Sequence, residues 1–449
     1  MLKKLGSVFL VSTLLFATSC GSGGGGTRQV DVPGQGGGVE GLRSKVNHVI
    51  FTFQENRSFD NYFGQLNAYR TARGLGADVD GLDRVNPQPP SNPTRDGLGT
   101  ITSFEMVSAC TSDVSPGWNE SHTQRNLRNP TITNPPLMDG FVSTAAAYAE
   151  RLGEWDVAGQ RAMGYYDDTI LPYYYYMATQ FATSDRFFSA LMAKSEPNYL
   201  YALAATSAGH VTIPDRTLSQ KTIFHLLQEA GVSWKVYTRN PNGNTALRYF
   251  QPFASQHEDR IVPIDQYFAD LRNGNLPAVA FIQHQSGQDE HPGANVQTGA
   301  KATADIINAF MRSQYWNDSI FLMAYDEGGG LYDHVPPMQT VSPDGIPPIL
   351  TVNNPNTFGD NFTLSGFRVP LLVISPFTRK GYVSHTPMDF TAFLKLIQTR
   401  WSLPSLTARD AAQPDMTEFF NFDNPPQPTP PTDVPSQPTS APCYRNALP

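Results

Sequence analysis

Short apolar runs rich in β-branched and aromatic residues alternate along the chain with segments whose apolar residues recur every three or four positions. The first pattern predicts buried strands and the second predicts amphipathic helices. The predicted strands are residues 48–53, 234–238, 278–283, 319–325 and 370–375. The predicted helices are residues 219–230, 303–316 and 389–401. This alternation predicts an α/β fold, a three-layer α/β/α sandwich around a mainly parallel sheet, in which ligands collect at the carboxyl ends of the strands.

The beginning of the chain lies outside this alternation. Lys3 and Lys4 precede an apolar run at residues 8–16, and small residues then lead to Cys20. This order predicts an export signal over residues 1–20. The residues Ala-Thr-Ser-Cys that end at Cys20 resemble the lipobox of bacterial lipoproteins. We therefore expect Cys20 to carry lipid and to anchor the exported protein to the bacterial envelope, on its periplasmic or cell-surface side; an ordinary signal peptide with an incidental Cys20 is the alternative.

Three further segments follow the predicted signal. Residues 21–42 are dominated by glycine and predict a flexible tether, residues 43–422 are the predicted catalytic domain, and residues 423–449 form a Pro-rich tail. In an oxidising compartment Cys110 and Cys443 are expected to pair, which would fasten the tail to the body only at Cys443. Two unrelated free thiols are the alternative.

Composition narrows the class of protein. Hydrophobic residues make up 40% of the chain, which excludes a disordered or fibrous protein. The 36 glycines and 37 prolines indicate many loops, where chemistry usually lies. A formal net charge of −8 argues against nucleic acid as a general partner, but it is compatible with an anionic substrate held by a bound cation.

Oxygen donors directly follow two of the predicted strands. Residues 48–53 lead into Glu55 and Asn56, and residues 319–325 lead into Asp326, Glu327 and three glycines. Two acidic strand ends can converge on one cation, and glycine lets the backbone approach closely. Either pair alone is equally well read as a turn or a solvated loop, but together they favour a metal site.

Ser195 stands at the start of a predicted helix, with Pro197 in its first turn. A helix N-terminus stabilises an alkoxide and an incoming phosphate, although a serine in this position is usually only a helix cap. A serine also needs a cation or a base to remove its proton before it can attack.

An ordered series of motifs resembles the bacterial phosphoesterase family, which includes non-haemolytic phospholipases C and acid phosphatases of the A type and is related to the alkaline phosphatase superfamily. The motifs are Glu55-Asn56-Arg57-Ser58-Phe59-Asp60, Met138-Asp139-Gly140-Phe141, Ser195 with Pro197-Asn198, Glu290-His291-Pro292, Asp326-Glu327 with Asp333-His334, and Arg368-Val369-Pro370 with Ser375-Pro376.

The resemblance implies a metal-dependent hydrolase of phosphate mono- or diesters. It implies that Glu55, Asn56, Asp326 and Glu327 bind a divalent metal ion and that Ser195 attacks phosphorus to form a phosphoserine. Oxygen ligands admit Ca, Mg, Mn or Zn. The expected partner is a phosphate ester, with a phospholipid left open, besides the membrane that the lipid anchor reaches.

The resemblance also assigns histidines. His291 and His122 are implied as catalytic residues, although Pro116 replaces an earlier family histidine and Tyr199 replaces a common arginine. Whether Asp333 and His334 bind the metal or orient its ligands stays open, and His284 is a weaker candidate for such a role.

Two rival functions remain. A sulfatase-like enzyme is disfavoured because no arginine stands two positions after Pro197, and a catalytically silent surface lipoprotein is the other alternative. Tyr165, Tyr166 and the tyrosines at 173–176 are read as packing rather than as an aromatic wall for a choline-type head group.

Overall fold

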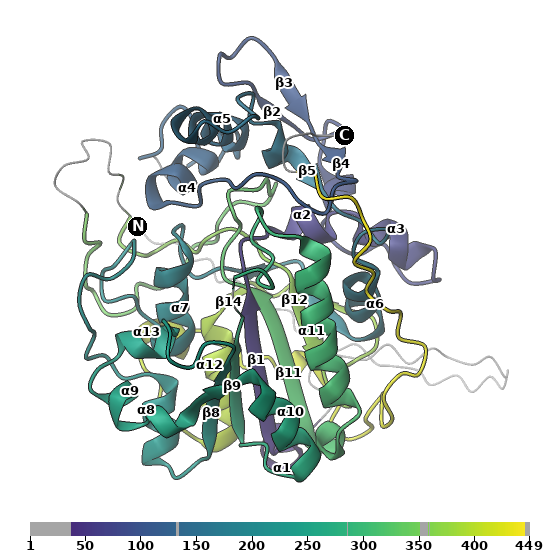
Figure 1. Cartoon of the computed structure of the whole chain (residues 1–449), viewed down its shortest axis with the longest axis vertical. Helices are drawn as coiled ribbons and strands as arrows, with labels where there is room; N and C mark the ends of the chain where they lie inside the picture. Colours follow the sequence, from purple (N-terminus) through teal and green to yellow (C-terminus); the bar gives the residue numbers. More distant parts are fainter. Residues whose placement is uncertain (1–36, 132–133, 285, 351–357, 359, 445–449) are drawn as a thin grey trace, which may run out of the picture. The chain divides into compact units, whose positions relative to one another are not determined.

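The computed structural model describes residues 37–131, 134–284, 286–350, 358 and 360–444. The predicted signal, Cys20 and most of the predicted tether lie outside these residues. The centre of the fold is an eight-stranded sheet in the order β13-β6-β12-β11-β1-β10-β8-β9 (Figure 1). Its strands are β1 (His48–Gln54), β6 (Ala182–Ser184), β8 (Trp234–Thr238), β9 (Ile261–Pro263), β10 (Val279–Gln283), β11 (Ser319–Tyr325), β12 (Leu371–Ile374) and β13 (Tyr382–Ser384).

The sheet is mainly parallel. β1 pairs in parallel with both β10 and β11, whereas β12 runs antiparallel to its neighbours β11 and β6. Phe51 on β1 lies opposite Phe281 on β10 and Leu322 on β11, and the two phenylalanine rings stack at 4.9 Å. Strands covered on both faces are apolar throughout, which is why these segments read as continuous apolar runs in the sequence.

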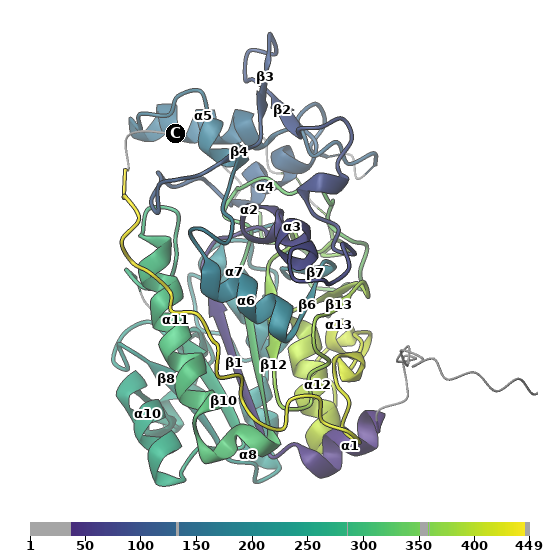
Figure 2. The same ribbon diagram turned by 90° about the vertical axis from the view of Figure 1, so that its right-hand side faces the viewer.

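Helices cover both faces of the sheet. One layer holds α6 (Pro172–Gln180), α10 (Ile264–Asn273) and α11 (Val296–Met311). The other layer holds α1 (Gly38–Lys45), α7 (Ser195–Ala204), α8 (Ile223–Glu229) and α12 (Thr391–Trp401). Figure 2 shows α10 and α11 on one side of the strands and α12 with α1 on the other. The predicted three-layer sandwich is therefore confirmed.

A smaller group of elements lies at the carboxyl end of the sheet. It contains α4 (Trp118–Arg125), α5 (Phe141–Leu152), β2 (Ser91–Pro93) and β3 (Thr100–Thr102), at the top of Figure 1. A separate apolar cluster that includes Val114, Phe141 and Leu331 joins this group to the loop after β11. The remaining short elements are α2 (Phe59–Phe63), α3 (Leu66–Thr71), α9 (Phe253–Gln256), α13 (Ala408–Ala411), β4 (Phe104–Glu105), β5 (Gly164–Tyr165), β7 (Phe187–Phe188) and β14 (Met388–Asp389).

The predicted elements are found, with shifted helix ends. β8 and β11 have the predicted bounds, β1 and β10 differ from the prediction by one residue at one end, and β12 is one residue shorter at each end. The predicted helix 303–316 is α11, which begins earlier because the Asn295 side chain accepts hydrogen bonds from the N–H groups of Gln297 and Thr298. α8 begins after Thr222, which forms a capping box with His225, rather than at Ser219.

The predicted boundary at residue 43 is wrong. α1 occupies the last part of the segment expected to be a tether, and its Leu42 is fully buried. A Cβ on Gly41 would lie 2.5 Å from the Cβ of Phe422, so the two segments are in close contact. The fold therefore includes residues that glycine content alone assigned to the tether.

The C-terminal tail is bound along its length. The expected disulfide between Cys110 and Cys443 is present, but the expectation that it alone fastens the tail is wrong. Trp316 Nε1 donates to the Gln427 carbonyl at 3.2 Å, and Gln437 Nε2 donates to the Ile170 carbonyl at 2.8 Å. Both glutamines are 4% exposed. The tail is therefore part of the fold. No helix in the ranges given above is long and apolar enough to cross a membrane.

We predict that ending the chain at Asp423 lowers the melting temperature by about 5 °C or more, because it removes the buried glutamine contacts together with the disulfide. Cys443→Ser, which leaves those contacts in place, is the matched variant and should lower it less. Differential scanning calorimetry measures both. Equal effects of the two changes would show that the tail contacts contribute no stability of their own.

Candidate active site

The two acidic strand ends meet because β1 and β11 are neighbours. Gln54 pairs in register with Tyr325, so Glu55-Asn56 and Asp326-Glu327 leave the sheet side by side. Asp326 Oδ1 accepts hydrogen bonds from the backbone N–H of Asn56 and of Glu327, both at 2.8 Å. We call the side chains of Glu55, Asn56, Asp326 and Glu327 the oxygen cluster. The structure brings all four together, as the sequence predicted.

One glycine allows the two loops to approach. Gly329 has a φ of 68°, and a Cβ there would lie 2.2 Å from the carbonyl oxygen of Asn56. Its N–H donates to Glu327 Oε2 at 2.5 Å. Any other residue would push the Asn56 loop away from Glu327, so this position requires glycine.

Ser195 is the first residue of α7, and its hydroxyl faces the oxygen cluster. Ser195 Oγ donates to Glu55 Oε2 at 3.0 Å and lies 3.4 Å from Asn56 Oδ1. The residue before it, Lys194, occupies the N-cap position without a side-chain hydrogen bond to the helix. Ser195 is therefore directed at the oxygen cluster rather than serving as a helix cap.

Negative charge accumulates in the oxygen cluster. Burial, together with the charge of Asp326, raises the pKa of Glu55 well above its usual range. Burial and Glu327 raise the pKa of Asp326 to about 8, and burial also raises the pKa of Glu327. Tyr199, at the position of the family arginine, donates its hydroxyl to Glu55 Oε1 at 2.8 Å. Three buried carboxyl groups thus destabilise one another when ionised.

A cation fits this group. Asp326 Oδ2 and Glu327 Oε1 are buried, and neither has a hydrogen-bond partner among the described residues. No Lys or Arg in the described ranges forms an ion pair with either side chain. Carboxylate and amide oxygens with free lone pairs are the ligands of hard divalent ions, so Glu55, Asn56, Asp326 and Glu327 are the residues that could hold one.

A second acidic group is already neutralised. Asp60, Asp333 and His334 offer ligand atoms within 4.8 Å of one another, a spacing that could also hold an ion. However, the Arg368 guanidinium donates to Asp333 Oδ1 at 2.8 Å and to Asp60 Oδ1 at 3.0 Å. We call Asp60, Asp333, His334 and Arg368 the arginine network, together with Asp80, which contacts His334.

The histidine of the arginine network also carries charge. His334 Nδ1 lies 2.6 Å from Asp60 Oδ2, and Nε2 lies 3.1 Å from Asp80 Oδ1. Burial opposes ionisation of the ring, but the two carboxylates outweigh it and raise the pKa of His334 to about 10. An imidazolium and a guanidinium leave little negative charge for a metal ion. His334 and Asp333 are thus better placed to orient the loops that carry the oxygen cluster than to bind metal.

His291 shares a cavity with Ser195. The cavity has a volume of about 190 Å³ and is lined also by Asn56, Asp113 and Lys194; we call it the Ser195 cavity. His291 Nε2 lies 3.6 Å from Glu55 Oε2, and Nδ1 lies 3.9 Å from Asp113 Oδ1. Burial lowers the pKa of His291, but Asp113 and Glu55 outweigh this effect and raise it overall. Its predicted place beside the nucleophile is consistent with this geometry.

His122 does not reach the Ser195 cavity, which corrects its expected catalytic position. Its Nδ1 bonds the Trp118 carbonyl at 2.7 Å, and Nε2 lies 3.2 Å from Asp360 Oδ2. Ser115 and Pro116 of the same stretch line the cavity instead. The family likeness placed the right segment at the site, but the helix α4 turns His122 into the protein.

His284 forms no hydrogen bond or ion pair with Ser195 or the oxygen cluster in the described part of the chain. Its Nε2 is buried without a partner, and burial lowers its pKa to about 3. The ring is therefore neutral at physiological pH, the form in which an imidazole can bind a metal, but no contact in the described part of the chain links it to the oxygen cluster.

The tyrosine-rich segment packs in the core. The hydroxyls of Tyr62, Tyr174 and Tyr325 all donate to the carboxylate of Glu290, at 2.5 to 2.7 Å. Burial raises the pKa of Glu290 to about 7 in spite of these bonds. This network fixes the residue that precedes His291, which confirms the packing interpretation of these tyrosines.

Sequence reasoning missed several residues of the site. Asp113, Lys194 and Tyr148 line the Ser195 cavity, and Asp80 completes the arginine network. The contact of Tyr199 with Glu55 was also missed, and Tyr199 alone among these residues was marked in the sequence, because it replaces an arginine common in the family. Asp80, Asp113 and Lys194 come from loops, and Tyr148 comes from α5; tertiary packing, which no local pattern determines, brings them to the site.

Comparisons with known proteins show the family of this chain. The model of the Phosphoesterase family matches residues 46–404. Phospholipase C B of Mycobacterium tuberculosis is 31% identical over 448 residues, 88% of this chain and 81% of that protein. Non-specific phospholipase C3 of Arabidopsis thaliana is 30% identical over 388 residues, 80% of this chain and 68% of that protein.

A solved alkaline phosphatase superfamily protein of Vibrio parahaemolyticus matches 78% of each chain with a TM-score of 0.36 at 11% identity. The family model and the relatives define a hydrolase that acts on phosphate-ester bonds. The chain belongs to the phosphoesterase family.

We predict that Asp326→Asn and Glu327→Gln each lower the metal content of the purified protein, because each removes an anionic ligand from the oxygen cluster. His334→Gln, in the arginine network, is the control and should keep the wild-type content. Inductively coupled plasma mass spectrometry measures the ratio of metal to protein. Loss of metal from His334→Gln alone would assign the ion to the other group.

We also predict that chelated protein loses stability as pH rises. A carboxyl whose pKa is raised on folding stabilises the fold below its unfolded pKa, and this contribution disappears as pH rises through the folded pKa. For Asp326 the window runs from about pH 4 to about pH 8. The melting temperature of the chelated wild-type protein should fall across this pH window, and the melting temperature of chelated Asp326→Asn should fall by a smaller amount. A fall of equal size in both proteins would contradict this assignment.

Proposed function

We propose that this protein is an exported, metal-dependent phosphoesterase that works through a phosphoserine at Ser195. One observation carries the proposal. The Ser195 hydroxyl lies 3.0 Å from Glu55, within a cluster whose Asp326 Oδ2 and Glu327 Oε1 are buried without a partner in the described structure. A nucleophile beside free anionic ligands is the arrangement that metal-assisted phosphoryl transfer requires.

The residues of the oxygen cluster would hold the ion. Bound there, a divalent cation would supply positive charge that favours ionisation of the Ser195 hydroxyl and neutralises a phosphate oxygen. Glu55 Oε2 accepts the Ser195 hydroxyl hydrogen and so fixes the direction of its oxygen. Tyr199 fixes the other oxygen of the same carboxylate.

Two further features would act on the phosphate. Ser195 begins the ten-residue helix α7, whose first N–H groups and dipole favour an anion at this end. His291 lies at the cavity wall, where burial lowers its pKa but the carboxylates of Asp113 and Glu55 outweigh that effect and raise it, which favours the protonated ring.

The reaction then has two steps. Ser195 Oγ forms a bond to phosphorus as its proton passes to Glu55 Oε2 and the ester bond breaks, and His291 gives its own proton to the departing oxygen. In the second step a water molecule attacks the phosphoserine while His291 takes a proton from that water. The bond between phosphorus and Ser195 Oγ breaks, Glu55 returns the proton to Ser195 Oγ, and the enzyme returns to its starting state.

The named relatives support a phosphodiester as substrate. They are phospholipases C by name, and they match most of this chain. Hydrolysis of a phosphodiester would leave the phosphorylated group on Ser195, and hydrolysis of a monoester would leave phosphate alone. We retain both classes of ester, with phospholipid as one source of the diester.

Export and lipid anchoring at Cys20 form part of the proposal, although Cys20 lies outside the described residues. The disulfide between Cys110 and Cys443 supports export, because such bonds persist in oxidising compartments.

We predict that Ser195→Ala lowers kcat for p-nitrophenyl phosphate and for p-nitrophenyl phosphorylcholine by about a thousandfold or more, because it removes the nucleophile. Ser195→Thr should keep part of the activity, since the hydroxyl is retained. Ser255→Ala, at an exposed serine of α9, is the control and should match the wild type. Full turnover by Ser195→Ala would refute the assignment.

A further inference from the structure

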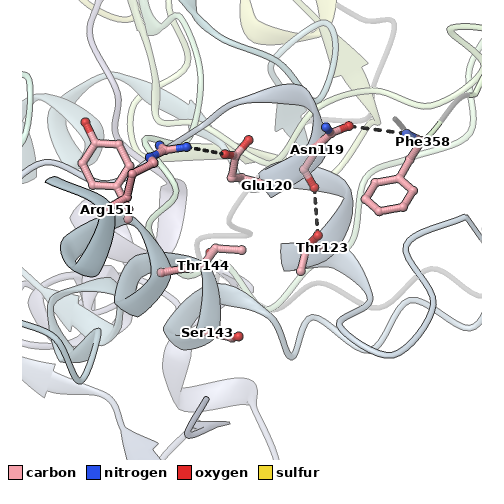
Figure 3. Close-up of a pocket in the computed structure, with 9 residues that line it drawn as sticks. Asn119, Glu120, Thr123, Ser143, Thr144, Arg151 and Phe358 are labelled. Atoms are coloured by element: carbon pink, nitrogen blue, oxygen red, sulfur yellow. Dashed lines mark hydrogen bonds and ion pairs between the residues drawn. The ribbon is translucent and has the colours of Figure 1, made fainter. Parts of the chain in front are cut away.

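A cavity lies beside the Ser195 cavity, between α4 and α5. It has a volume of about 330 Å³ and is lined by Glu120, Tyr148 and Arg151 among others (Figure 3). We call it the α4–α5 cavity. Tyr148 lines both this cavity and the Ser195 cavity. The proposed reaction uses none of these three side chains.

A third hollow of about 290 Å³ adjoins both cavities. It shares Glu120 and Arg151 with the α4–α5 cavity, and it shares Ser115 and Lys194 with the Ser195 cavity. The α4–α5 cavity is therefore close enough to the Ser195 cavity to receive a group bonded to a phosphate at Ser195.

The α4–α5 cavity already contains a cation supplied by the protein. The Arg151 guanidinium lies 5.2 Å from the centre of the Tyr148 ring and 3.7 Å from Glu120 Oε1. Figure 3 shows it directed at that carboxylate. An aromatic face and a carboxylate are the two groups that recognise an ammonium ion. The side chain of Arg151 is 59% exposed, so it can move into solvent without leaving a buried charge behind.

The surroundings of Tyr148 favour a positive ligand. Burial raises the pKa of the Tyr148 hydroxyl, and the nearby carboxylates of Asp113 and Glu154 raise it further against the opposing effects of Arg151 and Arg161. Among the residues that line the α4–α5 cavity, the charged side chains are Glu120 and Arg151. When Arg151 swings outward, the cavity would be left with a net negative charge.

We propose that the α4–α5 cavity is a subsite for the ammonium-bearing group of a phosphodiester substrate, bound by Glu120 and Tyr148, and that Arg151 occupies it in the free enzyme. The proposal rests on the phosphodiesterase activity proposed above. The ligand chemistry is a primary or quaternary ammonium joined to phosphate through a short alkyl chain. A phospholipid head group and a soluble choline ester both have this chemistry.

The test compares two diesters that differ in one charge. p-Nitrophenyl phosphorylcholine carries a quaternary ammonium, and p-nitrophenyl 3,3-dimethylbutyl phosphate replaces that nitrogen with carbon. In the wild type we expect KM to be about 5- to 10-fold lower for the choline ester. Glu120→Gln and Tyr148→Leu should each remove most of this difference. Glu150→Gln is the control. Glu150 lies on α5, as Tyr148 does, but pairs with Arg95 at the surface, so this variant should retain the difference in KM between the two diesters.

Arg151→Ala separates two roles for the guanidinium. If Arg151 occupies the subsite, its removal should lower KM for the choline ester by about 3-fold and leave the ratio in favour of that ester larger. If Arg151 instead binds the phosphate, its removal should raise KM for both esters, which would overturn the proposal.

Inhibition by a free ammonium ion gives an independent test of the subsite. Tetramethylammonium should inhibit hydrolysis of the choline ester competitively, and Glu120→Gln should weaken that inhibition. Equal KM values for the two diesters in the wild type would overturn the subsite while leaving the phosphoesterase intact. Absence of turnover for both diesters and for p-nitrophenyl phosphate would instead refute the proposed function. Short-chain phosphatidylcholine, compared with the soluble choline ester, shows which source the enzyme prefers.

Discussion

The structure depends on an excess of buried negative charge where β1 and β11 end. Glu55, Asp326 and Glu327 meet there, out of water, and each raises the pKa of another. Backbone N–H groups satisfy one oxygen of Asp326 and one of Glu327, but the second oxygen of each has no partner in the described structure. Burial of this kind is costly unless a cation completes it. Stability, metal binding and activation of Ser195 are therefore linked through the same four side chains.

Buried acidic side chains are accommodated in two opposite ways a few residues apart in the chain. The arginine network balances Asp60, Asp80 and Asp333 with the charges of Arg368 and His334, and it fixes the loops that follow β1 and β11. The oxygen cluster has no such balance. The disulfide ties the C-terminal tail to the segment that carries Asp113. Cys110 lies three residues before Asp113, which is on the wall of the Ser195 cavity. The C-terminal tail thus supports the site from outside.

Local patterns predicted what depends on local physics. Strands covered on both faces are continuous apolar runs, so β8 and β11 could be placed to the residue, and the donors at strand ends could be joined through the sheet. The glycine content of residues 21–42 suggested a tether, and α1 was therefore missed. In the structure its Leu42 is fully buried and its Gly41 lies against Phe422. His122 was placed by likeness to a motif, but the direction of its side chain depends on how α4 packs. Asp80, Asp113 and Tyr148 come from distant segments, and only tertiary structure brings them to the site.

The most direct test of the central claim is the position of the metal ion. Crystals grown with Mn²⁺ and measured near the manganese absorption edge would give an anomalous difference map. We expect a peak within bonding distance of Glu55, Asn56, Asp326 and Glu327, beside the Ser195 hydroxyl. A peak confined to Asp60, Asp333 and His334, or an oxygen cluster that remains without metal at saturating Mn²⁺, would contradict the account.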